Sequence, residues 1–198
     1  MKEITKEYWD SLYTSNDIGW DIGFPAPVFR EYIDQLEDKT VAILIPGCGN
    51  AYEAEYLLQK GFTNVTLIDI VPQVTAALEK RFESYLGKEL KIICGDFFQL
   101  TGPFDIIFEQ TFLSALPPNL RISYRDTMFN LLKPKGKIVG VLFNRVFDEE
   151  GPPFGATWGE YQHLFQSKFE IKKLEECYNS IDRRKGTEVF IHLVRKES

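Results

Sequence analysis

Residues 41–50 read Val41-Ala42-Ile43-Leu44-Ile45-Pro46-Gly47-Cys48-Gly49-Asn50, and the unit that they begin closes on Leu67-Ile68-Asp69. The apolar run predicts a buried strand over 41–45, followed by a glycine turn, a helix near 51–60 and a second strand over 65–70. In a parallel α/β sheet, this order places a bare backbone turn beside the carboxylate of Asp69 at the carboxyl ends of neighbouring strands. Nucleoside ligands bind at that edge, so the sequence predicts a nucleoside-cofactor protein.

The third residue after Gly49 separates two classes of cofactor. A dinucleotide site uses Gly-x-Gly-x-x-Gly, in which the third glycine lets the helix pack closely and meet a pyrophosphate. That position is Tyr52 in this chain. S-adenosyl-L-methionine (SAM) has no phosphate and needs only a close backbone approach to its methionine part. We therefore expect SAM rather than NAD.

Length and composition limit the classes of protein that remain. A chain of 198 residues with 44% hydrophobic side chains can bury one sizeable core but is short for two ordinary domains, so we expect a single domain over 1–198. The net charge of -6 gives no electrostatic footprint for a nucleic acid. No apolar run approaches the roughly 20 residues of a membrane-spanning helix. The expected partner is a small-molecule substrate, with no nucleic acid and no membrane; the sequence does not fix the oligomeric state, and a monomer is favoured.

The cysteines and histidines indicate the compartment and the metal content. Cys48, Cys94 and Cys177 show no paired spacing, and no signal segment leads the chain, so a reducing cytoplasm is expected. With two histidines and no clustered cysteines, we expect no metal site.

The rest of the chain alternates between predicted helices and buried strands. Helix-like apolar spacing over 4–14 and 25–36 predicts a helical cap over 1–38. The later elements are predicted as strands over 90–95, 104–109, 137–143, 168–175 and 187–195, and as helices near 72–86, 120–132 and 157–166. This alternation predicts an α/β fold with a mostly parallel sheet, helices on both faces and an antiparallel hairpin at its edge.

Two acidic residues follow predicted strands at the ligand edge of the sheet. Asp69 can accept hydrogen bonds from both ribose hydroxyls, and the alternative is a helix N-cap. Asp96 can accept from the adenine amino group while Phe97 covers the ring; the alternative is a turn or cap Asp with Phe97 in the core. Glu109 and Gln110 end the strand over 104–109 and can contact the methionine end of the cofactor, or else lie in a solvated loop.

Methyl transfer from a sulfonium to a soft anion neutralises charge, so a dry, aromatic site should help more than a proton shuttle. No catalytic residue is therefore predicted, and aromatic faces near the sulfonium would add about 0.5–2 kcal/mol of cation–π attraction. For any single aromatic, core packing is the alternative. The aromatic residues in segments that can close over the site are Trp9, Tyr13, Trp20, Phe112, Phe154 and Trp158.

The chain resembles the thiopurine S-methyltransferase superfamily, and within it especially the thiol and halide methyltransferase branch. The segments that carry the resemblance are Ile45-Pro46-Gly47-Cys48-Gly49, Leu67-Ile68-Asp69-Ile70, Phe108 to Leu116, Tyr124 to Leu132 and Gly151-Pro152-Pro153-Phe154. The resemblance implies a Rossmann-like class I fold with a seven-stranded sheet. It also implies a SAM-dependent methyltransferase that acts on a thiol, hydrosulfide, thiocyanate, halide or thiopurine-like acceptor. The alternatives are an O- or N-methyltransferase, with Glu109 as the base, and a non-catalytic SAM-binding module.

The same resemblance implies roles for individual residues. Trp9 and Tyr13 cover the cofactor, Gly47 contacts its methionine part, and the rest of the turn and strand ends complete the site. From the positions in the chain and the resemblance together, the predicted cofactor set is Trp9, Tyr13, Gly47, Cys48, Gly49, Asp69, Ile70, Asp96, Phe97, Glu109 and Gln110; the predicted substrate set is Trp20, Phe112, Phe154 and Trp158. Two departures bear on the acceptor. Thiopurine enzymes place Arg where this chain has Gln110, and the halide and thiol enzymes usually place Asp where Glu109 stands.

Overall fold

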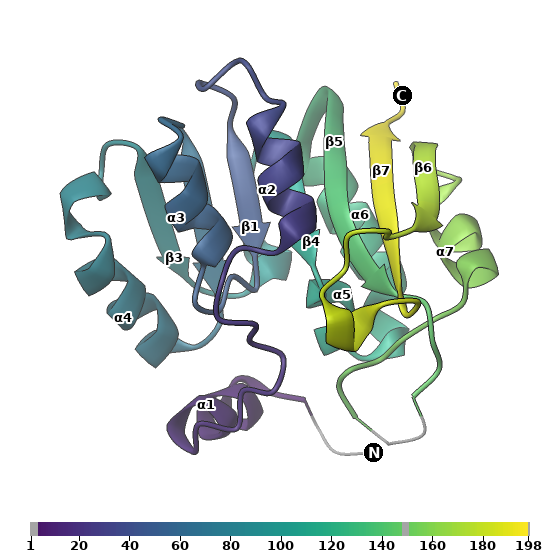
Figure 1. Cartoon of the computed structure of the whole chain (residues 1–198), viewed down its shortest axis with the longest axis horizontal. Helices are drawn as coiled ribbons and strands as arrows, with labels where there is room; N and C mark the ends of the chain where they lie inside the picture. The colour runs from purple at the N-terminus through teal and green to yellow at the C-terminus, as the bar shows by residue number, and fades with distance from the viewer. Residues whose placement is uncertain (1–3, 148–150, 198) are drawn as a thin grey trace. The chain divides into compact units, whose positions relative to one another are not determined.

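The computed structural model describes residues 4–147 and 151–197 (Figure 1). It divides into two compact units, an N-terminal unit that ends at Leu100 and a C-terminal unit that begins at Thr101. The expectation of a single domain stays a prediction. None of the helices among the described residues is long and apolar enough to cross a membrane.

A three-stranded parallel sheet forms the centre of the N-terminal unit, in the order β3-β2-β1. Every residue of β1 and β2 is buried, as expected for parallel strands that helices cover. The register pairs Pro46 with Ile68 and Asp69 with Cys94, so the three strand ends lie side by side. The elements of this unit are α1 (Lys6–Thr14), α2 (Pro27–Asp34), β1 (Ile43–Pro46), α3 (Tyr52–Gln59), β2 (Val65–Asp69), α4 (Pro72–Arg81), η1 (Glu83–Tyr85), β3 (Leu90–Cys94) and η2 (Phe97–Gln99).

The predicted elements of this unit all form, with one shortened. The helix expected over 72–86 begins with Pro72, whose fixed φ suits a first helical turn, and it ends at Arg81. The chain then tightens into the 3-10 turn η1 before Gly87, whose φ of +69° redirects it into β3. The part of the predicted helix beyond Arg81 is thus a separate 3-10 turn that leads into β3.

The C-terminal unit contains a four-stranded sheet in the order β4-β5-β7-β6. Strands β4 and β5 are parallel, and β7 runs antiparallel to both β5 and β6, which confirms the expected antiparallel hairpin at the edge. Helix α6 packs on β5 and α7 on β6. The elements are β4 (Phe104–Gln110), α5 (Phe112–Ala115), η3 (Pro118–Leu120), α6 (Arg121–Leu131), β5 (Leu132–Phe143), α7 (Trp158–Phe165), β6 (Phe169–Glu176), η4 (Asp182–Arg184) and β7 (Glu188–Arg195).

Two features of this unit differ from the expectation. Strand β5 begins at Leu132 rather than at residue 137, because Phe104 already pairs with Leu132 across an irregularity in the ladder. Lys135 takes a φ of +64° within that irregularity. The short helix α5, which follows Thr111 at a φ of +60°, was not expected from the sequence. The preceding helix, which was expected near 120–132, forms over Arg121–Leu131.

Candidate functional site

The glycine turn after β1 exposes bare backbone. Gly47, Gly49 and Ala51 all have positive φ, at 55°, 49° and 52°, so the chain curls tightly between Pro46 and α3. The N–H of Cys48 donates to the carbonyl of Ile68 at 3.3 Å, which holds the turn against the end of β2. Cys48 is buried, whereas Gly47 is exposed. The backbone at Gly47 is therefore open to close approach by a ligand.

Asp69 lies beside this turn, as the sequence predicted. Its Oδ2 accepts from the Gly49 N–H at 3.0 Å, and its Oδ1 accepts from the Val71 N–H at 3.0 Å. Val71, not Asp69, is the N-cap residue of α4, and no side chain caps that helix. The N-cap alternative is therefore wrong.

The state of Asp69 leaves it able to bind more donors. The side chain is buried, and this burial raises its pKa, against the backbone N–H groups of Val71, Gly49 and Ile70, which lower it. A carboxylate offers about four acceptor sites, so Asp69 keeps capacity for a further donor beside these three N–H groups. The ribose role stays a prediction.

The end of β3 lies next to Asp69, because the Gly95 N–H donates to the Asp69 carbonyl at 2.9 Å. Asp96 is exposed and caps η2 by accepting from the Phe98 N–H at 2.9 Å, so the cap expected as the alternative is present. Phe97 is buried, in line with the core alternative, while Ile70 is 37% exposed. Contacts of these residues with adenine stay predictions.

Three aromatic rings of the cap gather at the glycine turn. Trp20 packs edge-on against Trp9 and Tyr13, with ring centroids 5.4 and 5.6 Å apart. The Tyr13 hydroxyl lies 3.0 Å from the point that a Cβ on Gly49 would occupy. Burial, and then the charge of Asp69, raise the pKa of Tyr13. The structure thus brings Trp9, Tyr13 and Trp20 together in one unit, and their contacts with ligands stay predictions.

Two carboxylates that the sequence did not single out tie the cap to α3. Asp21 accepts from the side-chain amide of Asn50 and from the Tyr52 hydroxyl. Glu53 accepts from the Ala26 N–H at 3.0 Å, and burial raises its pKa to about 7. The sequence feature that could have indicated Glu53 is the presence of an acidic residue on the apolar face of a short helix. Tyr52, which stands where a dinucleotide site has its third glycine, is therefore held by the cap.

In the C-terminal unit, Glu109 is fully buried at the end of β4. Its Oε1 accepts from the Leu113 N–H of α5 at 3.0 Å, and its Oε2 accepts a close hydrogen bond from the Tyr124 hydroxyl of α6. Burial raises the pKa of this carboxyl to about 7, against these hydrogen bonds, which lower it. The solvated-loop alternative is wrong for Glu109. Gln110 is half-buried, and cofactor contacts of both residues stay predictions.

The predicted acceptor residues of this unit lie on adjoining segments. Phe112 belongs to α5, and its ring centroid is 6.1 Å from that of Tyr124. The N–H of Phe154 donates to the Ser114 carbonyl of α5 at 2.7 Å, which docks the Gly-Pro-Pro-Phe loop on α5. Trp158 opens α7 and is 39% exposed. Among residues 4–147 and 151–197, no group of three or more His, Cys, Asp or Glu could hold a metal ion.

Comparisons with known proteins connect this geometry to a family. A model of the thiopurine S-methyltransferase family matches residues 4–196. A thiopurine S-methyltransferase of Acinetobacter baylyi is 28% identical to the chain, over 91% of this chain and 92% of that protein. A probable thiol methyltransferase 2 of Arabidopsis thaliana is 27% identical, over 95% of this chain and 84% of that protein.

Among solved structures, the chain is similar to the 1,6-didemethyltoxoflavin-N1-methyltransferase of Burkholderia thailandensis, crystallised with 1,6-didemethyltoxoflavin and S-adenosylhomocysteine. The TM-score is 0.77 at 17% identity, with 98% of this chain and 88% of that chain covered. This likeness confirms the expected α/β, Rossmann-like class I methyltransferase fold, to which the N-terminal unit contributes three strands and the C-terminal unit four.

Proposed function

Because this chain belongs to the thiopurine S-methyltransferase family, we propose that it transfers a methyl group from SAM to a small, soft nucleophile. The chain is a SAM-dependent methyltransferase, and its relatives bear the names of thiopurine, thiol and thiocyanate methyltransferases. The observation that carries the proposal is the hydrogen bond from the Gly49 N–H to Asp69 beside the exposed backbone of Gly47. Thiols, hydrosulfide, thiocyanate and halides are our preferred acceptors.

The residues of the N-terminal unit fit SAM. Gly47 offers exposed backbone, and Asp69 offers a carboxylate with unused acceptor capacity. Tyr52 leaves no glycine for a pyrophosphate. When bound, SAM supplies a methyl carbon activated by a sulfonium. We assign the methionine part to the turn from Gly47 to Gly49, the ribose to Asp69, and the adenine to Ile70, Asp96 and Phe97, with Trp9 and Tyr13 as the cover.

The chain's own residues act on the acceptor by excluding water and fixing its position. In the N-terminal unit, Trp20 is our proposed contact with the acceptor. In the C-terminal unit, Phe112, Phe154 and Trp158 are proposed to contact it, and Gln110 the methionine end of SAM. Apolar surroundings favour attack by a soft anion on a cation, because charge disappears as the new bond forms.

No general base is part of this proposal. Both oxygens of Glu109 already accept hydrogen bonds, from Leu113 and from Tyr124, so the carboxylate is engaged in holding α5 and α6. Acceptors that are anionic at neutral pH, such as hydrosulfide, need no base. Gln110, where thiopurine enzymes carry Arg, further favours small thiols and halides over thiopurines.

Two linked measurements test the proposal. S-adenosylhomocysteine should raise the melting temperature of the protein, and NADH should not. With SAM and separate portions of hydrosulfide, thiocyanate, iodide and a thiopurine, mass spectrometry should find a methylated product for at least one of the first three. Intact S-adenosylhomocysteine binding with no product from any acceptor would refute the substrate class.

We also propose that the chain works as a single domain, as a monomer and in a reducing cytoplasm. Among the described residues, Cys48, Cys94 and Cys177 form no disulfide, which suits a reducing compartment. A single calorimetric transition and a monomer mass in solution are the expected results. Two separate transitions, or a dimer at micromolar concentration, would contradict the first two proposals.

A further inference from the structure

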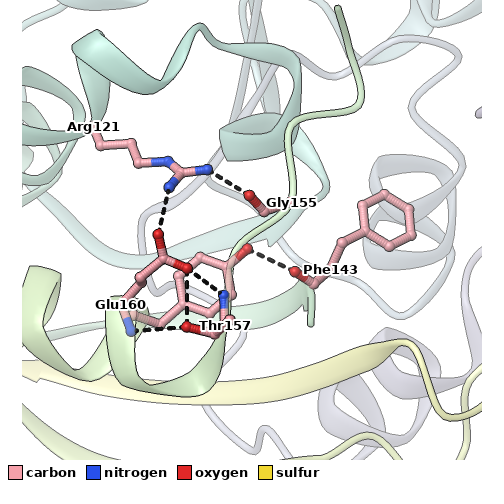
Figure 2. A network of polar contacts seen from close by, with 6 residues as sticks. Arg121, Phe143, Gly155, Thr157 and Glu160 are labelled. Atoms are coloured by element: carbon pink, nitrogen blue, oxygen red, sulfur yellow. Dashed lines mark hydrogen bonds and ion pairs between the residues drawn. The ribbon is translucent and has the colours of Figure 1, made fainter. Parts of the chain in front are cut away.

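Arg121, at the start of α6, joins two distant parts of the C-terminal unit (Figure 2). Its Nη2 donates to the carbonyl of Gly155 at 2.7 Å, across 34 positions of sequence. Its Nη1 lies 3.8 Å from Oε1 of Glu160. The side chain is only 16% exposed, so the guanidinium is largely removed from water. The Arg121 guanidinium thus contacts both the residue that follows the Gly-Pro-Pro-Phe loop and helix α7.

Glu160 connects Arg121 to the beginning of α7 through hydrogen bonds with Thr157 (Figure 2). Its Oε2 accepts from the N–H of Thr157 at 2.8 Å and from the Thr157 hydroxyl at 2.9 Å, and that hydroxyl accepts from the Glu160 N–H at 3.4 Å. This reciprocal capping box fixes the first turn of the helix. Trp158 is the first residue of that turn, so Arg121 acts on its position through Glu160.

The loop before α7 is held just as closely. Gly155 has no room for a side chain, because a Cβ there would lie 1.8 Å from the Arg145 carbonyl oxygen. The Ala156 N–H donates to the Phe143 carbonyl at 3.3 Å, and the Tyr161 hydroxyl donates to the same oxygen at 2.8 Å. Arg121 adds a side-chain hydrogen bond from α6 to this backbone, next to Phe154.

Arg121 is not arranged for stability alone. Its Nε is buried and has no hydrogen-bond partner among the residues that the structure describes. A buried donor without a partner is costly, and such groups in native proteins call for an explanation other than packing. The planar guanidinium instead places its two terminal nitrogens on two segments at once, which an ammonium group on a flexible stem does not do.

We propose that Arg121 is a positioning residue, which holds Phe154 and Trp158 in place and thereby sets the size of acceptor that the enzyme takes. The inference rests on the proposed function, in which these two aromatic residues contact the acceptor. It assigns no contact between Arg121 and the substrate.

The test compares three variants. Arg121→Gln removes both the positive charge and the two terminal nitrogens of the guanidinium. Arg121→Lys keeps the positive charge but has a single nitrogen. Arg125→Gln is the matched control. Arg125 lies one turn further along α6, is 15% exposed, and binds Asp126 and Ser167 rather than the loop. Each variant is measured for amide hydrogen exchange over 151–158, for S-adenosylhomocysteine affinity by calorimetry, and for KM and kcat with hydrosulfide and with a bulky aryl thiol.

In Arg121→Gln we expect faster exchange at 154–158 and a KM for hydrosulfide about tenfold higher, the equivalent of one charge-assisted hydrogen bond. The preference between the two thiols should fall at least severalfold, with unchanged S-adenosylhomocysteine affinity. Arg121→Lys should change amide exchange, KM and thiol preference in the same direction as Arg121→Gln. It serves as the test variant if Arg121→Gln does not fold. Arg125→Gln should leave exchange, KM and preference as in the unmodified chain.

Three results would overturn the inference. The first is that the Arg121 and Arg125 variants change amide exchange, KM and thiol preference to the same extent. The second is that the Arg121 variants exchange faster but keep the KM and the thiol preference of the unmodified chain. The third is that neither Arg121 variant changes amide exchange. An unmodified chain that methylates no acceptor would overturn the proposed function and this inference together. An active chain whose preference between the two thiols is the same with and without Arg121 would overturn this inference alone.

Discussion

Replacement of Glu109 by Gln should change how the free energy of unfolding depends on pH, with a sign and a size that follow from the pKa of Glu109. Native burial raises the pKa of Glu109 from 4.5 to about 7, so the folded protein binds this proton more tightly than the unfolded chain does. The free energy of unfolding therefore falls as pH rises from about 4.5 to about 7. A difference of this size corresponds to about 3 kcal/mol at most above pH 7. Below pH 4.5 both states are protonated, and the loss vanishes.

Gln is a neutral side chain of nearly the same shape as the protonated acid at this position. Its carbonyl oxygen can accept from the Leu113 N–H, and its amide can donate to the oxygen of Tyr124. Glu109→Gln should therefore match the unmodified chain at pH 4.5 and exceed its stability by up to about 3 kcal/mol at pH 8. Glu109→Leu, the control, leaves both partners without an acceptor and should be about 2–4 kcal/mol less stable than the Gln variant at both pH values.

Urea unfolding followed by circular dichroism, at intervals from pH 4.5 to 8, measures these differences. The same variant also tests the absence of a base: kcat of Glu109→Gln with hydrosulfide should stay within about threefold, whereas loss of a general base would cost at least about a hundredfold. A stability difference that does not change with pH, or a hundredfold loss of kcat in a folded variant, would show the reasoning about Glu109 to be mistaken.

Three further predictions concern tightly packed or buried positions. Gly140→Ala should destabilise the fold by more than about 3 kcal/mol, since its Cβ would lie 1.8 Å from a carbonyl oxygen of β4; urea unfolding measures this, and a near-neutral result would contradict the packing. Gly49→Ala should weaken S-adenosylhomocysteine binding at least about tenfold in calorimetry, because its φ is +49° and its Cβ would lie 3.0 Å from the Tyr13 hydroxyl. Removing that hydroxyl in Gly49→Ala/Tyr13→Phe should restore part of the affinity, and no recovery would count against the contact. Glu53→Gln should raise the melting temperature at pH 8 but not at pH 4.5, because burial raises the pKa of Glu53 to about 7, and equal shifts at both pH values would exclude this cause.

The strand, turn and acid of the N-terminal unit could be predicted from the sequence because local patterns set them. An apolar run, two glycines and a second strand fix the order of elements, and parallel pairing then brings Asp69 to Gly49 without any further information. The antiparallel edge hairpin followed for the same reason, since no long helix separates its strands. The residues that pattern reasoning placed well are those whose position depends on near neighbours in the chain.

The rest depends on contacts between residues distant in sequence. Glu109 was expected at a strand end, in contact with the cofactor or else in a solvated loop, and the pattern did not show that it is buried with a hydrogen bond from Tyr124, 15 positions later. Arg121 carries no motif, and its role follows only from the loop that reaches it at Gly155. Helix α5 is four residues long, too short to leave a periodic pattern. Asp96 shows the limit in another way, because a cap and a ligand contact call for the same residue type at the same place.

Calorimetric titration of S-adenosylhomocysteine into the unmodified chain and into Asp69→Asn tests most directly whether the glycine turn and Asp69 hold the adenosyl group. Asn keeps the volume but loses the charge and one acceptor for the backbone N–H groups of Gly49 and Val71. We expect saturable one-to-one binding by the unmodified chain and an affinity about ten- to a hundredfold lower in the folded variant. No binding by the unmodified chain, or equal affinity of the two proteins, would contradict the account.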